Sequence, residues 1–327
     1  MIRRLFLFVV VLAVLAAVVA GSGWYWFKEQ TRRAGPHGTD AVVLIPPGTS
    51  IHSIAGKLTD QGLLRSDLVF RLAARLGQAD RSLKAGEFRI PARASVSAVL
   101  DVLTKGETVA RSFTIPEGLT VSEAMDIIAG AEGLTGPLPA APDEGRLLPE
   151  TYQYRYYDSK AEALRRVEKA MDAALAKAWA GREDGLPLNS PTEALILASI
   201  VEKETGVKAE RARVAAVFLN RLRKGMKLQS DPTVIYGITH GRFLLGRPLS
   251  RADLNAPTSF NTYVIDGLPP TPIANPGLAA IEAVLHPDKT NELYFVADGT
   301  GGHAFAETLI QHNRNVAKWR KIQRNGK

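Results

Sequence analysis

The 327-residue chain contains no cysteine, and it has fewer acidic residues (33) than lysines and arginines (41). The absence of cysteine excludes disulfides, thiolate metal sites, a cysteine nucleophile and lipid attachment at cysteine. The shortage of acidic residues gives a net charge of +8, which favours an anionic neighbour such as a membrane surface, a cell-wall polymer or nucleic acid. Zinc-finger spacings and aromatic-rich RNA-binding motifs are also absent, so nucleic acid is not an expected partner.

Familiar catalytic signatures are missing as well. Gly299–Gly302 is not followed by the Lys-Ser/Thr pair of a phosphate-binding loop, and no Gly-x-Ser-x-Gly elbow occurs. His286, His303 and His312 lack the i, i+4 spacing on a helix that a zinc peptidase needs. We therefore predict no metal and no cofactor, and expect chemistry that side chains perform alone.

A long apolar run opens the chain. Leu5–Phe27 ends in the aromatic triplet Trp24–Trp26 and is long enough to cross a bilayer, with the aromatics at the interfacial belt. The simplest topology is a single-pass protein of the cell inner membrane, with residues 1–4 as a cytoplasmic tail and the remaining mass in the periplasm. A signal peptide cleaved between Ala20 and Gly21 is the alternative. We favour a retained anchor, because the apolar run continues past that point.

Three copies of one pattern follow a polar linker predicted for residues 28–40. Each copy joins a short β-like run to a helical pattern through Ile-Pro and a Ser or Thr: Ile45–Ile51, Ile90–Val96 and Ile115–Val121. Proline ends the strand, Ser or Thr caps the helix, and the residue after the cap begins its buried face. The predicted strands are Val42–Ile45, Glu87–Ile90 and Ser112–Ile115, and the predicted helices are Ile51–Gln61, Val96–Lys105 and Val121–Ala129. The units are similar to LysM-type glycan-binding modules, so we expect a LysM-like region at residues 41–130; ordinary βα units without glycan binding are the alternative.

A second linker, rich in Gly, Ala and Pro, is predicted at residues 131–142, and a mixed α/β domain at residues 143–327. Its central element is a helix that begins near Ser190, because Pro191 and a series of good helix formers follow, without Gly or Pro until Gly206.

Two carboxylates near the end of this helix meet different surroundings. A helical projection at about 100° per residue places Glu204 near the centre of the apolar face and Glu202 roughly opposite. Glu202 is expected to be solvated or engaged by a neighbouring segment. Glu204 is expected to point to the interior or a cleft, where an apolar setting raises a carboxyl pKa and suits a general acid. The alternative is that Glu204 pairs with Arg211 or Arg213.

Two later segments carry many hydrogen-bonding side chains. Met226–Gly237 sets them in an apolar frame, as the wall of a sugar- or peptide-binding cleft would. For Ser230 or Asp231 the alternative is a structural turn in which the side chain caps the backbone. Phe260–Tyr263 leads into a Pro-rich stretch that suits a cleft rim.

Long motifs of the chain resemble the YceG-like (MltG) family of endolytic murein transglycosylases. The resemblance rests on Ala198–Thr205, which contains Glu-Lys-Glu, on Val217–Leu222, Met226–Gly237 and Phe260–Tyr263, and on Gly267–Pro270, Ile273–Pro276 and Tyr294–Ala297. It implies an α+β protein with an N-terminal transmembrane helix, a LysM-like βα region and a mixed α/β catalytic domain. It also implies that the second glutamate of Glu-Lys-Glu, Glu204, is catalytic, the same residue that the helical projection selects.

The resemblance further implies a reaction. Glu204 would protonate the bond between MurNAc and GlcNAc in nascent peptidoglycan glycan strands, then take a proton from the MurNAc 6-hydroxyl, leaving a 1,6-anhydro end that terminates strand elongation. Peptidoglycan synthases are the expected partners. Candidate residues for holding the sugars are Gln229, Ser230, Asp231, Thr233, Tyr236, Asn261 and Tyr263, with Glu150 and Tyr152 from a further segment. A non-catalytic glycan-binding scaffold and a hydrolytic muramidase using Asp231 as second carboxylate are the alternatives.

Overall fold

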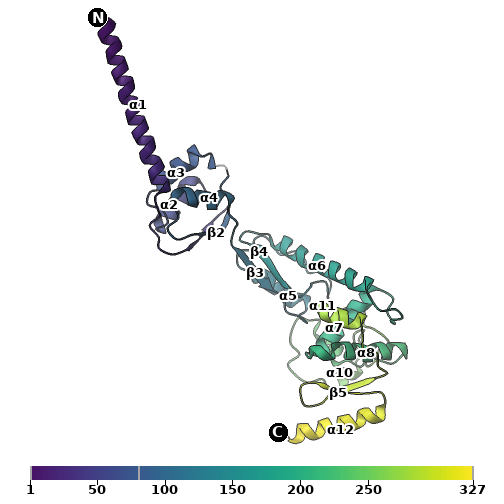
Figure 1. Ribbon diagram of the computed structural model, residues 1–327. Helices are drawn as coiled ribbons and strands as arrows, with labels where there is room; N and C mark the ends of the chain where they lie inside the picture. Colours follow the sequence, from purple (N-terminus) through teal and green to yellow (C-terminus); the bar gives the residue numbers. More distant parts are fainter. Residues whose placement is uncertain (1, 80–81, 326–327) are drawn as a thin grey trace. The chain divides into compact units, whose positions relative to one another are not determined.

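A computed structural model describes residues 2–79 and 82–325 and has a mixed α/β architecture (Figure 1). The chain forms two compact units. The smaller contains Met1–Arg111 with Tyr154–Tyr157, and the larger contains Ser112–Gln153 with Asp158–Lys327. The sequence places a boundary at residues 131–142, whereas the two units divide after Arg111, so the third copy of the repeated pattern belongs to the larger unit.

The first helix, α1 (Ile2–Arg32), is long and apolar enough to cross a membrane, and none of its most apolar window is buried in the protein. It continues beyond Phe27, so residues 28–32 of the predicted linker are helical. The side chain of Phe27 packs against the core of the smaller unit. The apolar helix and this unit are therefore joined by packing as well as by the chain.

The smaller unit contains two copies of the strand–turn–helix pattern. Strands β1 (Ala41–Ile45) and β2 (Gly86–Ile90) pair antiparallel, with Val43 opposite Phe88. The helices are α2 (Ile51–Asp60), α3 (Asp67–Leu76) and α4 (Val96–Lys105). Ser50 and Ser95 accept hydrogen bonds from backbone N–H groups in the first turns of α2 and α4, which confirms the predicted caps. Helix α3 was not predicted, although Ser66 caps it in the same way.

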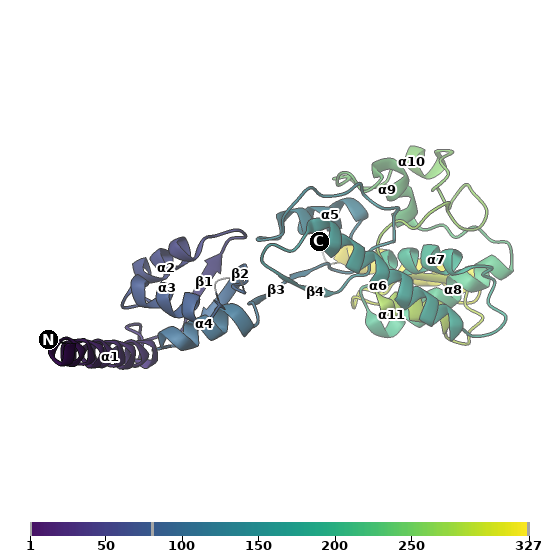
Figure 2. The same ribbon diagram turned by 90° about the horizontal axis from the view of Figure 1, so that it is seen from above.

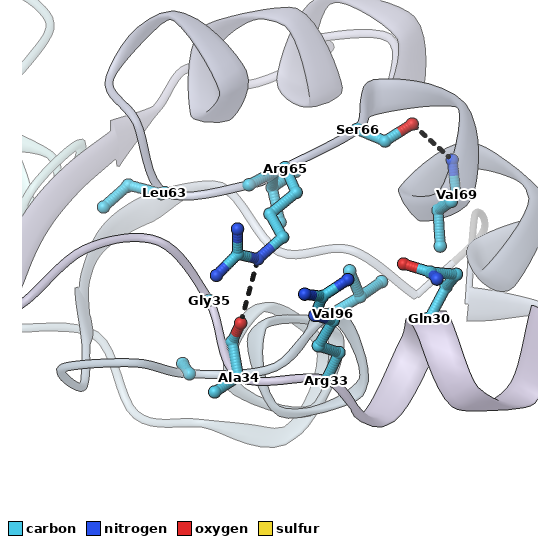
Figure 3. A pocket seen from close by; sticks show the side chains of 11 residues that line it. Gln30, Arg33, Ala34, Gly35, Leu63, Arg65, Ser66, Val69 and Val96 are labelled. Atoms are coloured by element: carbon cyan, nitrogen blue, oxygen red, sulfur yellow. Dashed lines mark hydrogen bonds between the residues drawn. The ribbon is translucent and has the colours of Figure 1, made fainter.

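Figure 3 shows the hollow where the end of α1 meets the start of α3. Arg65 Nε donates a hydrogen bond to the carbonyl of Ala34 at 3.2 Å. One residue further, the Gly35 N–H donates to the carbonyl of Arg93 at 3.0 Å. Two backbone positions just after α1 are thus held by segments that precede α3 and α4.

The third copy of the pattern begins the larger unit. Strand β3 (Ala110–Thr114) pairs with β4 (Thr151–Arg155), and α5 (Val121–Gly130) follows. Thr120 and Glu123 form a reciprocal capping box at the start of α5. The predicted strand and helix are confirmed here, and β4 is the additional strand.

The larger unit is built around α7 (Pro191–Glu204), which begins after Ser190 as predicted. All residues from Ala194 to Val201 are buried, because α6 (Lys160–Ala180), α8 (Arg211–Arg223), α9 (Asp231–Thr239) and α11 (Leu278–Leu285) pack against α7. Figure 2 shows α6, α8 and α11 gathered around α7. A helix covered on several sides has no purely solvated face, so the projection of a single apolar face was incomplete. The remaining elements are α10 (Arg251–Asn255), β5 (Tyr294–Ala297), β6 (His303–Ala306) and α12 (Leu309–Asn325).

Asn275 joins three segments of this unit and is fully buried. Its side-chain oxygen accepts a hydrogen bond from the N–H of Leu147 at 2.9 Å, and its side-chain nitrogen donates to the carbonyl of Leu119 at 2.9 Å. Its own N–H donates to the same Leu119 carbonyl, and its carbonyl accepts from the N–H of Gly118. Loops before α5, before β4 and before α11 are therefore fixed by one amide.

Replacing Asn275 with alanine leaves the buried Leu147 N–H without an acceptor. We expect Asn275→Ala to destabilise the larger unit by about 2–3 kcal/mol, because an unsatisfied buried group carries its desolvation penalty. Thermal unfolding of the full chain in detergent measures the loss. Asn255→Ala is the matched control, since that asparagine is exposed and its side chain donates to the carbonyl of Arg251 within α10; equal melting shifts for the two variants would contradict the assignment.

Candidate functional site

The last three residues of α7 bond to three different segments. Glu202 accepts a hydrogen bond from the backbone N–H of Gly277 at 2.9 Å, and Lys203 Nζ donates to the carbonyl of Gly118 at 3.1 Å. Glu204 accepts one from Ser230 Oγ at 2.5 Å. The Glu-Lys-Glu sequence thus fixes the carboxyl end of α7 against the loops before α11, α5 and α9.

Glu202 is an ion-pair residue with a side chain only 5% exposed. Arg211 bridges it at 3.0 Å and Glu117 at 2.8 Å. Burial raises the pKa of Glu202, while the hydrogen bond from Gly277 and the charge of Arg211 oppose that rise. Of the two environments expected for Glu202, engagement by a neighbouring segment is confirmed.

The predicted alternative for Glu204, a pair with Arg211 or Arg213, is wrong. Arg211 is occupied by Glu117 and Glu202, and Arg213 forms a two-bond pair with Glu292 at 2.8 and 2.5 Å. No arginine pair therefore needs to be broken before Glu204 can take part in proton transfer.

Ser230 occupies the N-cap position of α9, yet its hydroxyl makes no cap hydrogen bond and is directed to Glu204 instead. The serine backbone is held from behind. Its N–H donates to Thr262 Oγ1 at 2.9 Å, and its carbonyl accepts from Thr233 Oγ1 at 2.7 Å. The capping alternative is therefore wrong for Ser230, because a buried threonine pair supports the residue and leaves its hydroxyl available to the carboxyl.

The surroundings of Glu204 raise its pKa, so that its carboxyl is partly protonated at neutral pH. Burial, the largest cause, raises its pKa to about 7. The hydrogen bond from Ser230 opposes that rise, the negative charge of Asp231 adds to it, and the positive charges of His303 and Arg221 oppose it more weakly. A carboxyl with this pKa can donate and accept a proton at the same pH.

Asp231 and Tyr263 form a second polar pair at the start of α9. Tyr263 Oη donates a hydrogen bond to Asp231 Oδ1 at 2.6 Å. Asp231 is exposed and Tyr263 is half-buried. Asp231 lies near enough to Glu204 for its negative charge to help raise the pKa of Glu204. Tyr263 lies near enough for the charge of Glu204 to act on its hydroxyl.

Two further side chains near Glu204, Arg221 and His303, were not selected as site residues from the sequence. Arg221 is buried, donates to the carbonyls of Leu228 and Leu293, and also reaches Gln229 Oε1 at 3.4 Å. His303 Nδ1 lies 2.7 Å from Glu210 Oε2. Arg221 lies within the motif Val217–Leu222, and His303 was considered only as a metal ligand. Sequence spacing does not reveal that α8 and β6 bring these two residues to the end of α7.

The other candidates occupy varied positions. Thr233 and Asn261 are fully buried, and the Asn261 amide donates to three backbone carbonyls, those of Asp253, Leu254 and Ala256. Gln229 is exposed, with a left-handed backbone at φ +54°. Tyr236 Oη donates to Glu144 Oε2 at 3.1 Å.

Glu150 and Tyr152 belong to the region of β4. Glu150 is exposed, while Tyr152 Oη donates to the carbonyl of Leu148 at 2.7 Å and its ring stacks on Phe113. These contacts do not involve Glu204 or Ser230.

A cavity of about 420 Å³ adjoins the site. Its wall includes Lys203 and Pro232, which are the chain neighbours of Glu204 and Asp231. The wall also includes Asp126 of α5 and the loop that carries Arg242 and Phe243, a residue that is 59% exposed. The volume is within the range of small-molecule sites. Sequence reasoning did not select this loop, because no motif marked it.

The chemistry of this arrangement is that of a single acid. Glu204 supplies one transferable proton, Ser230 orients it, and Asp231 is the second carboxyl nearby. Within residues 2–79 and 82–325, His, Asp and Glu side chains form no group of three that could hold a metal ion.

Comparison with known proteins places this site in a family. The model of the YceG-like family matches residues 43–318. The chain is 31% identical to an endolytic murein transglycosylase of Bacillus subtilis, over 86% of this chain and 85% of that protein. It is 28% identical to an endolytic murein transglycosylase of Streptococcus pneumoniae, over 95% of this chain and 65% of that protein.

A solved structure supports the same assignment. The crystal structure of a yceG-like protein from Listeria monocytogenes superposes with a TM-score of 0.53 at 29% identity, covering 84% of this chain and 98% of that one. The family match and this structural likeness agree over most of the chain. The chain therefore belongs to the YceG-like family.

Proposed function

We propose that this chain is a lytic transglycosylase that cleaves peptidoglycan glycan strands internally, the activity for which its relatives in Bacillus subtilis and Streptococcus pneumoniae are named. The observation that carries the proposal is the half-buried carboxyl of Glu204, hydrogen-bonded by Ser230 and with its pKa raised to about 7. An acid of this kind is what protonation of a glycosidic oxygen at neutral pH requires.

The proposed reaction uses Glu204 twice. Glu204 first protonates the oxygen between MurNAc C1 and the GlcNAc leaving group. The resulting carboxylate then removes the proton of the MurNAc 6-hydroxyl, whose oxygen bonds to C1 and closes a 1,6-anhydro ring. No water is consumed, and an intramolecular nucleophile needs no second carboxylate to activate it.

Some of the neighbouring residues face the substrate, and others hold the substrate-facing residues in position. Ser230 orients the Glu204 carboxyl, and Asp231 with Tyr263 stabilises positive charge that develops on the sugar. Thr233 and Asn261 act through the backbone around Ser230 and Tyr263, because their own polar atoms are used inside the protein. Tyr236 and Phe243 line the adjoining cavity, where we expect them to meet sugars or attached peptide, and the exposed Gln229 is a further side chain that we expect to contact the strand.

The remaining parts of the chain place the enzyme at the membrane. We infer that α1 anchors the enzyme in the cell inner membrane with its N-terminus cytoplasmic, so that the larger unit acts outside the cytoplasm on strands close to the membrane. Glycan binding by the LysM-like copies, glycan binding through Glu150 and Tyr152, and association with peptidoglycan synthases are further parts of this proposal.

Removal of the acid is the first test. We expect Glu204→Gln to lower the rate of cleavage of uncrosslinked peptidoglycan by about 10²–10⁴-fold, because general acid–base catalysis contributes that much. Mass spectrometry of the wild-type products should find anhydro-ended fragments. Glu162→Gln is the matched control, since this exposed carboxyl on α6 lies in a surface pair with Arg165.

Two other product patterns would contradict the proposal. Fragments heavier by one water would indicate a hydrolase, with Asp231 as the second carboxylate. Intact strands that remain bound to the protein would indicate a non-catalytic scaffold.

The pH dependence gives a second test. Since the protonated Glu204 is the active form, kcat/KM should fall as pH rises through about 7. Ser230→Ala removes an interaction that lowers the pKa of Glu204, so the fall should move to higher pH. Asp231→Asn removes a negative charge that raises this pKa, so the fall should move to lower pH. Shifts in the same direction for both variants would exclude Glu204 as the group that titrates.

A further inference from the structure

Helix α3 carries an exposed stripe of large apolar side chains. Leu68, Leu72 and Leu76 are 53%, 41% and 60% exposed. They follow one another at four-residue spacing, so adjacent members are separated by about 40° around the helix and share one side. The neighbouring face is different, since Val69, Phe70 and Ala74 are buried in the smaller unit. The stripe is therefore a second apolar surface that the unit itself leaves uncovered.

The stripe begins beside the apolar helix α1. Leu76 lines a cavity of about 650 Å³ together with Trp24 and Phe27 of α1 and Leu100 of α4. Both views of the ribbon show α3 on the side of the smaller unit that meets α1 (Figures 1 and 2). Trp24 belongs to the aromatic triplet that suits the interface between lipid and water. Leu76 accordingly lies at the interfacial level of the span, and Leu72 and Leu68 continue from it.

Cationic side chains border the apolar stripe. Arg75 is exposed and projects about 20° from Leu68 and 60° from Leu72 around the helix axis. Arg71 pairs with Asp67 at 2.7 Å. On α1, Lys28 Nζ lies 5.4 Å from the centre of the Trp24 ring. An apolar stripe edged by arginine and lysine is typical of helices that lie in the headgroup region of a membrane.

We propose that the stripe Leu68, Leu72 and Leu76 docks on the lipid bilayer, on the side where α1 leaves it. The inference rests on the proposed membrane span of α1. Lipid is favoured over a protein partner because the stripe is continuous with the interfacial end of α1 and because basic side chains flank it. The contact holds the smaller unit on the membrane surface through α3 as well as through α1 and the segments bonded to its end.

The absence of native cysteine allows a direct test on the full chain. Single variants Leu72→Cys and Leu76→Cys each receive a nitroxide label after reconstitution into vesicles of zwitterionic and anionic phospholipid. The relative accessibility of the label to oxygen and to a water-soluble nickel complex reports its depth. Val42→Cys is the matched control, because Val42 is an aliphatic residue 50% exposed on β1, outside α3 and its leucine stripe. Val14→Cys reports the middle of α1.

The labels at positions 72 and 76 are expected about 5–10 Å within the boundary between headgroups and acyl chains. The label at position 42 should remain aqueous, and the label at position 14 should be deepest. Aqueous labels at 72 and 76 with a deep label at 14 would overturn the docking while leaving the membrane span intact. Labels at 72 and 76 shielded from both reagents would indicate a protein contact and overturn it too. An aqueous label at 14 would remove the span and the docking together.

Discussion

The structure of the site depends on the immobilised carboxyl end of α7. Glu202 and Lys203 bond to the loops at Gly277 and Gly118, which fixes the backbone from which the Glu204 side chain extends. Gly277 also leaves room for Glu117, which shares Arg211 with Glu202, because a Cβ at Gly277 would lie 2.1 Å from Glu117 Oε1. Glu204 is consequently held beside Ser230 at the end of a helix that packs against several others, a fixed placement of the kind that the proposed acid needs.

The raised pKa of Glu204 makes the folded protein less stable as the pH rises. The pKa of Glu204 in the folded protein, about 7, is above its ordinary value of 4.5. Between these values the native state binds more protons than the unfolded state, so stability falls as pH rises through this window. The loss above pH 7 is on the order of 3 kcal/mol, since one pKa unit corresponds to about 1.4 kcal/mol. Functional sites commonly retain such unfavourable groups because the chemistry needs them.

Local patterns in the sequence predicted much of the fold. The Ile-Pro and Ser/Thr pattern located β1, β2, β3 and their following helices, and the run after Ser190 located α7. These features depend on residues close together in the chain. Helix α3 was missed because its exposed leucines obscure a single apolar face. In the proposed docking, α3 has two apolar faces, one packed in the core of the smaller unit and one covered by lipid.

The candidate site could be predicted only in part for a similar reason. Glu204 was selected because its direction on α7 follows from helix geometry alone. The burial of Glu202 did not follow, because packing by α8 and the loop at Gly277 covers the far side of the helix. The direction of the Ser230 hydroxyl, and the approach of Arg221 and His303, likewise arise from tertiary contacts between distant segments.

The proposed reaction requires Glu204 to titrate near neutral pH, far above the ordinary glutamate value, so that a large share of its carboxyls is protonated at pH 7. Infrared difference spectroscopy of the full chain, titrated with pH and compared with Glu204→Gln, would observe the C=O stretch of its protonated carboxyl directly. We expect a band that is absent from the variant and that disappears from the wild type with a midpoint near pH 7. A midpoint near the ordinary glutamate value of 4.5 would contradict it.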